Sequence, residues 1–219
     1  MSKIELTIPT SWDDITLGQY IQLRPVLNTD MNDVKRIINV LAVLTNEKTD
    51  LIKEITIPNY HVILKKISFL NDPLPTELEK NLFKIGGQLY KFKLNSNKLL
   101  FGEYINLMEI MQKASDNEEI IYENLHKIFT IICRPVKKTI LGIKEIKVTS
   151  EDVRNNADNF FNNMSISIAY PIAVFFCNHY PDLIKVIKTS LIQMAQKNKK
   201  TAEMMLKKEG LMSHGVGSA

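Results

Sequence analysis

Two short segments of this chain have nearly the same sequence. Residues 15–23 read ITLGQYIQL and residues 99–107 read LLFGEYINL, with glycine, tyrosine, isoleucine and leucine at equivalent places. A second pair of similar segments, Leu51–Ile57 and Gly142–Val148, follows in the same order. Two ordered matches at nearly constant spacing are typical of a tandem duplication. The sequence therefore predicts two related helical subdomains.

Local patterns predict a mainly α-helical fold. Thr16 is a suitable N-cap, and Gln19 three residues later completes a capping-box pattern at the start of a short helix. Pro25 argues against an unbroken helix through that position. Apolar residues at helical spacing predict further helices over residues 33–44, 59–70, 100–112, 118–133 and 152–163, with 50–57 left open between a short helix and an extended segment.

A small antiparallel β element is predicted between the two copies. Gly86 and Gly87 stand between apolar residues over the range 82–94, which is the pattern of a β-hairpin. An isolated two-stranded hairpin is marginal in water, so a third strand is expected. The alternating residues 4–8 are the predicted partner.

The predicted domain organisation follows from these elements. Residues 1–93 are the first repeat with its N-terminal strand and hairpin, and residues 94–163 are the second repeat. Residues 164–219 are a C-terminal helical extension that ends in a flexible basic tail. The apolar run 166–177 contains Ser167 and Pro171 and is shorter than the roughly 20 residues that a bilayer span requires. We therefore predict a buried segment and no membrane partner.

The residues shared by the two copies are predicted to be structural. Each tyrosine packs on a following helix with its hydroxyl at the edge, and each glycine allows close backbone contact at a helix start. A ligand site is the less favoured alternative. The residues are Trp12, Gly18, Tyr20, Leu23, Gly102, Tyr104 and Leu107.

No pattern of catalytic or metal-binding residues stands out. The two cysteines give neither a disulfide framework nor a metal cluster, and indicate a reducing compartment. The four histidines are far apart in the sequence and lack metal-ligand spacing. We therefore predict no catalytic residues, no cofactor, no metal and no enzymatic activity.

Lysines concentrate near the C-terminus although the net charge of the chain is only +4. They are candidate contacts with a protein partner or with DNA. No aromatic residue follows Tyr180, so this segment has no platform for base stacking, and a solvated or protein-facing helix is favoured. The lysines are Lys185, Lys188, Lys197, Lys199, Lys200, Lys207 and Lys208.

The first copy also resembles a known group of proteins. Residues 9–20, PTSWDDITLGQY, and the predicted helix that ends at 44–46 resemble small proteins from the structural-gene clusters of tailed bacteriophages. Residues 124–135 are similar to the second helix of the same group, and the composition resembles that of crAss-like phages of Bacteroidota hosts. The resemblance covers roughly residues 1–180.

This resemblance implies a non-enzymatic structural protein of a tailed-phage particle, in the tail or the head–tail connector. It would act through contacts with other phage structural proteins, as a homo-oligomer in a ring or in multiple copies, and weakly with packaged DNA. It would be found in the virion, and in the host cytoplasm during assembly. One alternative is a tail assembly chaperone that is absent from the mature virion. A second is a DNA-contacting protein without sequence specificity.

Overall fold

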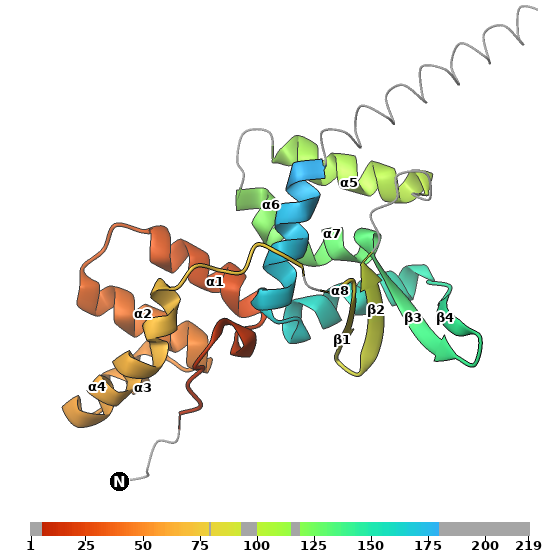
Figure 1. Ribbon diagram of the computed structural model, residues 1–219. Helices are drawn as coiled ribbons and strands as arrows, with labels where there is room; N and C mark the ends of the chain where they lie inside the picture. Colours follow the sequence, from red (N-terminus) through yellow and green to blue (C-terminus); the bar gives the residue numbers. More distant parts are fainter. Residues whose placement is uncertain (1–5, 79, 93–99, 115–118, 180–219) are drawn as a thin grey trace, which may run out of the picture. The chain divides into compact units, whose positions relative to one another are not determined.

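The computed structural model describes residues 6–78, 80–92, 100–114 and 119–179 (Figure 1). The chain divides into two compact units, residues 1–175 and 176–219. Within the described residues the protein is mainly helical and contains a small four-stranded antiparallel sheet. The predicted fold class is confirmed at this level.

The first helix begins where the capping pattern predicts. A short 3₁₀ helix, η1 (Trp12–Asp14), precedes α1 (Leu17–Asn28). The Thr16 amide donates to Oε1 of Gln19 at 3.0 Å, and the Gln19 amide donates to the Thr16 hydroxyl at 3.2 Å, which satisfies two helix-end donors. The predicted break at Pro25 is wrong. Proline removes only one N–H donor, and the Thr29 amide closes the last turn on the Pro25 carbonyl at 3.0 Å.

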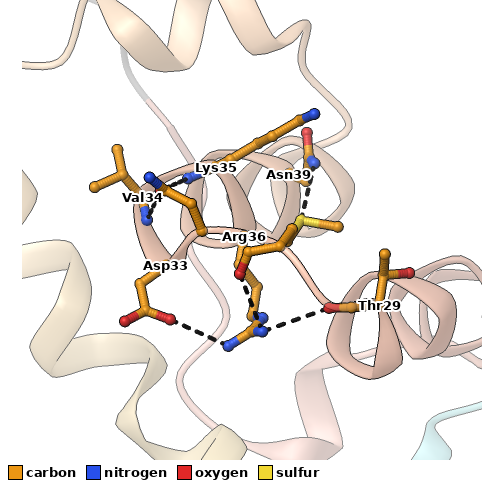
Figure 2. Close-up of polar contacts among 8 residues, drawn as sticks. Thr29, Asp33, Val34, Lys35, Arg36 and Asn39 are labelled. Carbon is orange, nitrogen blue, oxygen red and sulfur yellow. Dashed lines mark hydrogen bonds and ion pairs between the residues drawn. The ribbon is translucent and has the colours of Figure 1, made fainter.

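Helix α2 (Asp33–Thr45) follows after a short loop that its own side chains close (Figure 2). Oδ1 of Asn32 accepts from the amides of the first turn. The Arg36 guanidinium bonds the Asp33 carboxylate and the backbone carbonyl of Thr29. Asn46 ends the helix in the left-handed conformation, at the predicted stop.

Three more helical segments follow before residue 72. Helix α3 (Thr49–Lys53), α4 (Ile57–Lys66) and the 3₁₀ segment η2 (Ile67–Asn71) follow in order. The segment 50–57, left open by its sequence pattern, is therefore largely helical. The predicted helix over 59–70 is confirmed, with its last turn tightened to 3₁₀ geometry.

The sheet has the strand order β1-β2-β3-β4, with every neighbouring pair antiparallel. Strands β1 (Leu82–Ile85) and β2 (Gln88–Phe92) form the predicted hairpin. Gly86 and Gly87 adopt φ of 52° and 84°, which other residues rarely tolerate. The third strand is β3 (Cys133–Thr139). Residues 6–8 form no strand, so for this described part the predicted N-terminal partner is wrong.

The second half of the first unit mixes helices with strands. Helices α5 (Phe101–Lys113), α6 (Glu119–Glu123), α7 (Leu125–Ile132) and α8 (Ser150–Asn163) surround β3 and β4 (Gly142–Glu145) in sequence. The single helix predicted over 118–133 is interrupted at Asn124 and ends at Ile132. The break expected at Arg134 and Pro135 is confirmed, because both residues lie in β3: a residue before proline disfavours helical geometry, and β2 offers a strand partner.

The duplicated helical subdomains are not confirmed. The starts of α1 and α5 do correspond, since the matched tyrosines each occupy the fourth residue of a helix. The second match is wrong. Residues 51–57 are helical for the most part, whereas 142–145 form the strand β4. Strand pairing with β3 overrides the similarity of these two isoleucine-rich segments.

One large group of buried apolar side chains lies on α7, α8 and the helix formed by residues 166–179, and a smaller group lies on α1 and α2. Phe129 and Phe160 are fully buried and pack edge to face. On the last helix, Ile166, Ala169 and Ile172 are also fully buried, at the spacing of one helical face. The predicted buried segment is thus confirmed for that face. No described helix has the length and apolarity that a membrane crossing requires.

Candidate protein interaction site

The residues of the first copy lie together at the start of α1, as structural elements. Trp12 packs against Phe69 and Tyr20 with ring centroids 5.3 and 6.3 Å away, and its indole N–H donates to the Asp72 carbonyl at 3.1 Å. Leu23 is completely buried. These contacts tie the start of α1 to the end of η2.

The same segment is fastened to the start of the helix 166–179. The Leu17 amide donates to the Met164 carbonyl at 2.7 Å, and the Ile166 amide donates to the Ile15 carbonyl at 2.8 Å. The Ser167 hydroxyl donates to the Asp13 carboxylate. Residues far apart in sequence therefore fix the position of residues 13–17, and the Asp13 carboxylate serves as an acceptor for the Ser167 hydroxyl.

The second copy reproduces the helix start but not its surroundings. The Leu100 amide donates to Oε2 of Glu103 at 3.0 Å, as the Thr16 amide does to Gln19. Leu107 is fully buried and Tyr104 is half-buried. Gly102 faces open space. The structure does not bring the two copies together into one site.

A cluster centred on Arg24 lies between α1 and α6, and no sequence pattern predicts it. The Arg24 guanidinium lies 3.3 Å from the ring centroid of Tyr122 and 3.1 Å from Oε1 of Glu119. Burial raises the pKa of the nearby Tyr20 hydroxyl. This cluster joins two elements whose proximity only the tertiary structure establishes.

The cysteines and histidines of the described residues form neither a disulfide nor a metal-binding cluster. Cys133 is buried in β3, and burial raises the pKa of its thiol, so the thiol stays protonated. Neither Cys133 nor Cys177 forms a disulfide. Over the part of the chain that the structure describes, no three His, Cys, Asp or Glu side chains gather as a metal site would require.

The most distinctive surface is the hairpin of β3 and β4, which we call the arm (residues 137–147). Every residue of the arm is exposed. Ile140 and Leu141 form its turn and are 104% and 99% exposed, while Ile143 and Ile146 are 49% and 37% exposed. Single exposed apolar residues are ordinary on protein surfaces, but an apolar cluster at a projecting turn marks a contact site.

The base of the arm is held firmly, unlike its tip. Val136 is buried, and its carbonyl accepts from the Gln88 side chain at 3.0 Å. Arg134 forms a two-bond ion pair with Glu103 of α5, with both N–O distances 2.7 Å. The Ile146 amide donates to the Pro135 carbonyl at 2.9 Å. The arm is therefore presented from a fixed base.

The arm is basic. Lys137 and Lys144 lie directly opposite each other across the two strands, and Lys138 lies opposite Ile143. Like charges in opposite positions destabilise a strand pair slightly. Lysines on an outer strand also hinder uncontrolled edge-to-edge pairing. The arm thus combines an apolar tip with a cationic stem, which suits a partner with an apolar recess and acidic rim.

Sequence reasoning missed the arm because it treated residues 142–148 as a copy of residues 51–57, a segment whose own conformation was left open. The signal that favours a hairpin is the turn Ile140–Leu141, followed by Gly142 with φ of 115°. The C-terminal lysines that were predicted as partner or DNA contacts, from Lys185 to Lys208, lie outside the described residues.

The geometry thus defines a mainly helical protein with a small antiparallel sheet and a projecting basic hairpin. Comparisons with family models, with curated proteins and with solved structures found no match to this chain.

Proposed function

We propose that this chain is a non-enzymatic structural protein of a tailed-phage particle, in the tail or the head–tail connector. It acts through protein–protein contacts with other structural proteins of the particle. The observation that supports this proposal is the arm, whose fully exposed Ile140 and Leu141 are not packed within the part of the chain that the structure describes. The resemblance of residues 9–20 to phage structural-cluster proteins supplies the setting.

The role of the arm follows from simple energetics. An apolar side chain gains roughly 1.5–3 kcal/mol when it leaves water. At the tip, the described residues of the chain do not provide this gain, and a second molecule can. The rigid base at Arg134 and Val136 lowers the entropy lost on binding, since the hairpin does not have to order itself first.

Mass spectrometry of purified particles from the phage that encodes the chain tests the proposal. We expect the protein at a fixed ratio to the other tail or connector subunits. A complementation assay tests the role of the arm. A phage that lacks the gene, supplied with the variant Ile140→Ser/Leu141→Ser, is expected to form incomplete particles. Absence of the protein from finished particles would overturn the structural assignment.

A tail assembly chaperone is the second candidate function, because an exposed apolar tip also suits transient binding to an unassembled tail protein. The same measurement separates the two functions. A chaperone is abundant in infected cells and depleted from finished particles, whereas a structural subunit is enriched in them. The proposal keeps the predicted C-terminal extension. It keeps the predicted repeat only for the helix start that the two copies share.

A further inference from the structure

The chain carries a recess that suits the tip of its own arm. A cavity of about 380 Å³ lies beside β1 and the start of the helix 166–179. Leu78, Leu82, Phe83 and Ile168 give it apolar walls. Its volume lies within the roughly 300–1,000 Å³ of cavities that hold small ligands. Two aliphatic side chains are a suitable occupant for a recess of this size and lining.

The charges around this cavity are complementary to the arm. Asp13 and Glu77 contribute two carboxylates to its lining, against the single cation of Lys80. The arm carries Lys137 and Lys138 next to its apolar turn. Electrostatic complementarity of this kind fixes which surfaces meet and speeds their encounter.

A second cavity, of about 530 Å³, is excluded by the same criterion. It lies among α5, α7 and α8. Its cations Lys113, Lys127 and Arg154 outnumber its acids Glu103 and Glu109. Glu103 is moreover already paired with Arg134. A lysine-rich arm would meet a net positive rim at this cavity, so the smaller cavity is the better site.

We propose that the chain self-associates head to tail, with Ile140 and Leu141 of one copy seated in the cavity beside β1 of a second copy. The arm and the cavity are different surfaces, so the contact is heterologous. In a dimer, one copy therefore keeps an unoccupied cavity and the other keeps an unbound arm. Strand β1 is one edge of the described sheet and β4 is the other. Such a contact therefore joins opposite edges of the sheets of successive copies. This inference rests on the proposed role of the arm as a contact surface.

Sedimentation velocity of the purified full-length chain over a range of concentrations tests the inference. Three variants are compared with the parent. The arm variant is Ile140→Ser/Leu141→Ser, the cavity variant is Leu78→Arg, and the control is Val34→Ser/Val62→Ser. The control residues are 62% and 57% exposed and lie on α2 and α4. We expect the arm and cavity variants each to raise the dissociation constant at least about tenfold, and the control to leave it unchanged.

A mixing experiment identifies the geometry of the contact. The arm variant keeps an intact cavity, and the cavity variant keeps an intact arm. An equimolar mixture is therefore expected to form dimers and nothing larger, although each variant alone is monomeric. If Leu78→Arg fails to fold by circular dichroism, Glu77→Lys at an exposed position replaces it. In that case Lys138→Glu in the arm of the other copy is expected to restore binding.

Several outcomes would overturn the inference. One is a parent chain that stays monomeric up to about 1 mM, which corresponds to a binding free energy weaker than about 4 kcal/mol. Another is an arm variant that associates as strongly as the parent. A cavity variant that still dimerises alone would indicate arm-to-arm contact instead. A monomeric chain that binds duplex DNA, and loses that binding in Lys137→Gln/Lys144→Gln, would assign the arm to nucleic acid. None of these results depends on whether the protein is found in particles, so the two proposals fail separately.

Discussion

Gly18 lies directly against Phe161, so that a Cβ at residue 18 would come within 2.6 Å of Cε1 of that ring and 2.8 Å of the Phe161 carbonyl oxygen. Gly102, the matching residue of the second copy, has nothing within 4 Å of the same position. Identical residues at identical helix positions thus have different roles. One permits the contact of α1 with α8, and the other only begins a helix.

The two glycines provide a matched pair of substitutions. Gly18→Ala is expected to lower the free energy of unfolding by about 1–3 kcal/mol, because the methyl group meets backbone as well as ring atoms. Gly102→Ala is expected to be neutral or to stabilise by up to about 1 kcal/mol, since alanine favours helix. Urea unfolding followed by circular dichroism measures both. Equal effects would contradict the contact.

The ion pair at the base of the arm is separable from the helix cap that Glu103 also provides. Glutamine caps α1 at the matching position, so Glu103→Gln can keep the bond from the Leu100 amide. It removes the charge that faces Arg134 and replaces one of the two oxygens that bind the guanidinium with an N–H donor. Both side chains are 19% exposed. We expect a loss of about 1–2 kcal/mol in unfolding free energy, which shrinks at high salt. Glu109→Gln, at an exposed position of the same helix, is the control. No change on Glu103→Gln would mean that the pair contributes nothing.

A tyrosine hydroxyl joins the first hairpin to α8. The Tyr90 hydroxyl donates to Oδ1 of Asn156 at 2.7 Å and accepts from Nδ2 of Asn159 at 3.1 Å. Tyr90→Phe is expected to cost about 1–3 kcal/mol, because it leaves partly buried amide groups without this partner. Tyr60→Phe, at a half-buried site on α4, is the comparison and is expected to cost less than 1 kcal/mol. Thermal unfolding of both variants gives the difference.

Stability should depend on the protonation of His126. Burial, with a further contribution from Lys127, lowers the pKa of this imidazole below its ordinary value of 6.5. The unfolded chain therefore binds a proton more readily, and the contribution of neutral His126 is complete above pH 6.5 and lost as pH falls through the folded-state pKa. His126→Gln removes this dependence. Unfolding free energies of parent and variant, measured from about pH 7 to about pH 5, are expected to converge as pH falls. The exposed His61→Gln variant is expected to follow the parent, and parallel profiles for parent and His126→Gln would contradict the prediction.

The tip and the base of the arm should respond oppositely to substitution. Ile140→Ser/Leu141→Ser removes side chains that are fully exposed, so the free energy of unfolding should stay within about 0.5 kcal/mol of the parent. Val136→Ala removes a side chain that is 1% exposed, and should cost about 1–3 kcal/mol. Denaturant unfolding of the two variants distinguishes a docking surface from a packed one. A large loss on changing the tip would show that it packs within the chain.

Local chemistry in the sequence was enough to predict the elements whose hydrogen bonds close within a few residues. The Thr16 and Gln19 cap, the stop at Asn46 and the Gly86–Gly87 turn all belong to this class. In each, a side chain or a permitted φ satisfies the backbone without help from distant residues. The buried face of the helix 166–179 was predictable for a related reason, because apolar spacing records which side of a helix avoids water.

Only the tertiary structure decided the elements that depend on a distant partner. Residues 133–136 are a strand because they pair with β2, although the apolar run before them has a helical pattern. Gly18 and Gly102 differ only because Phe161 stands beside one of them. The arm became a candidate contact surface only when its side chains proved to be exposed. Such outcomes depend on contacts between segments far apart in the chain. A local sequence pattern does not indicate which distant segment will lie next to it.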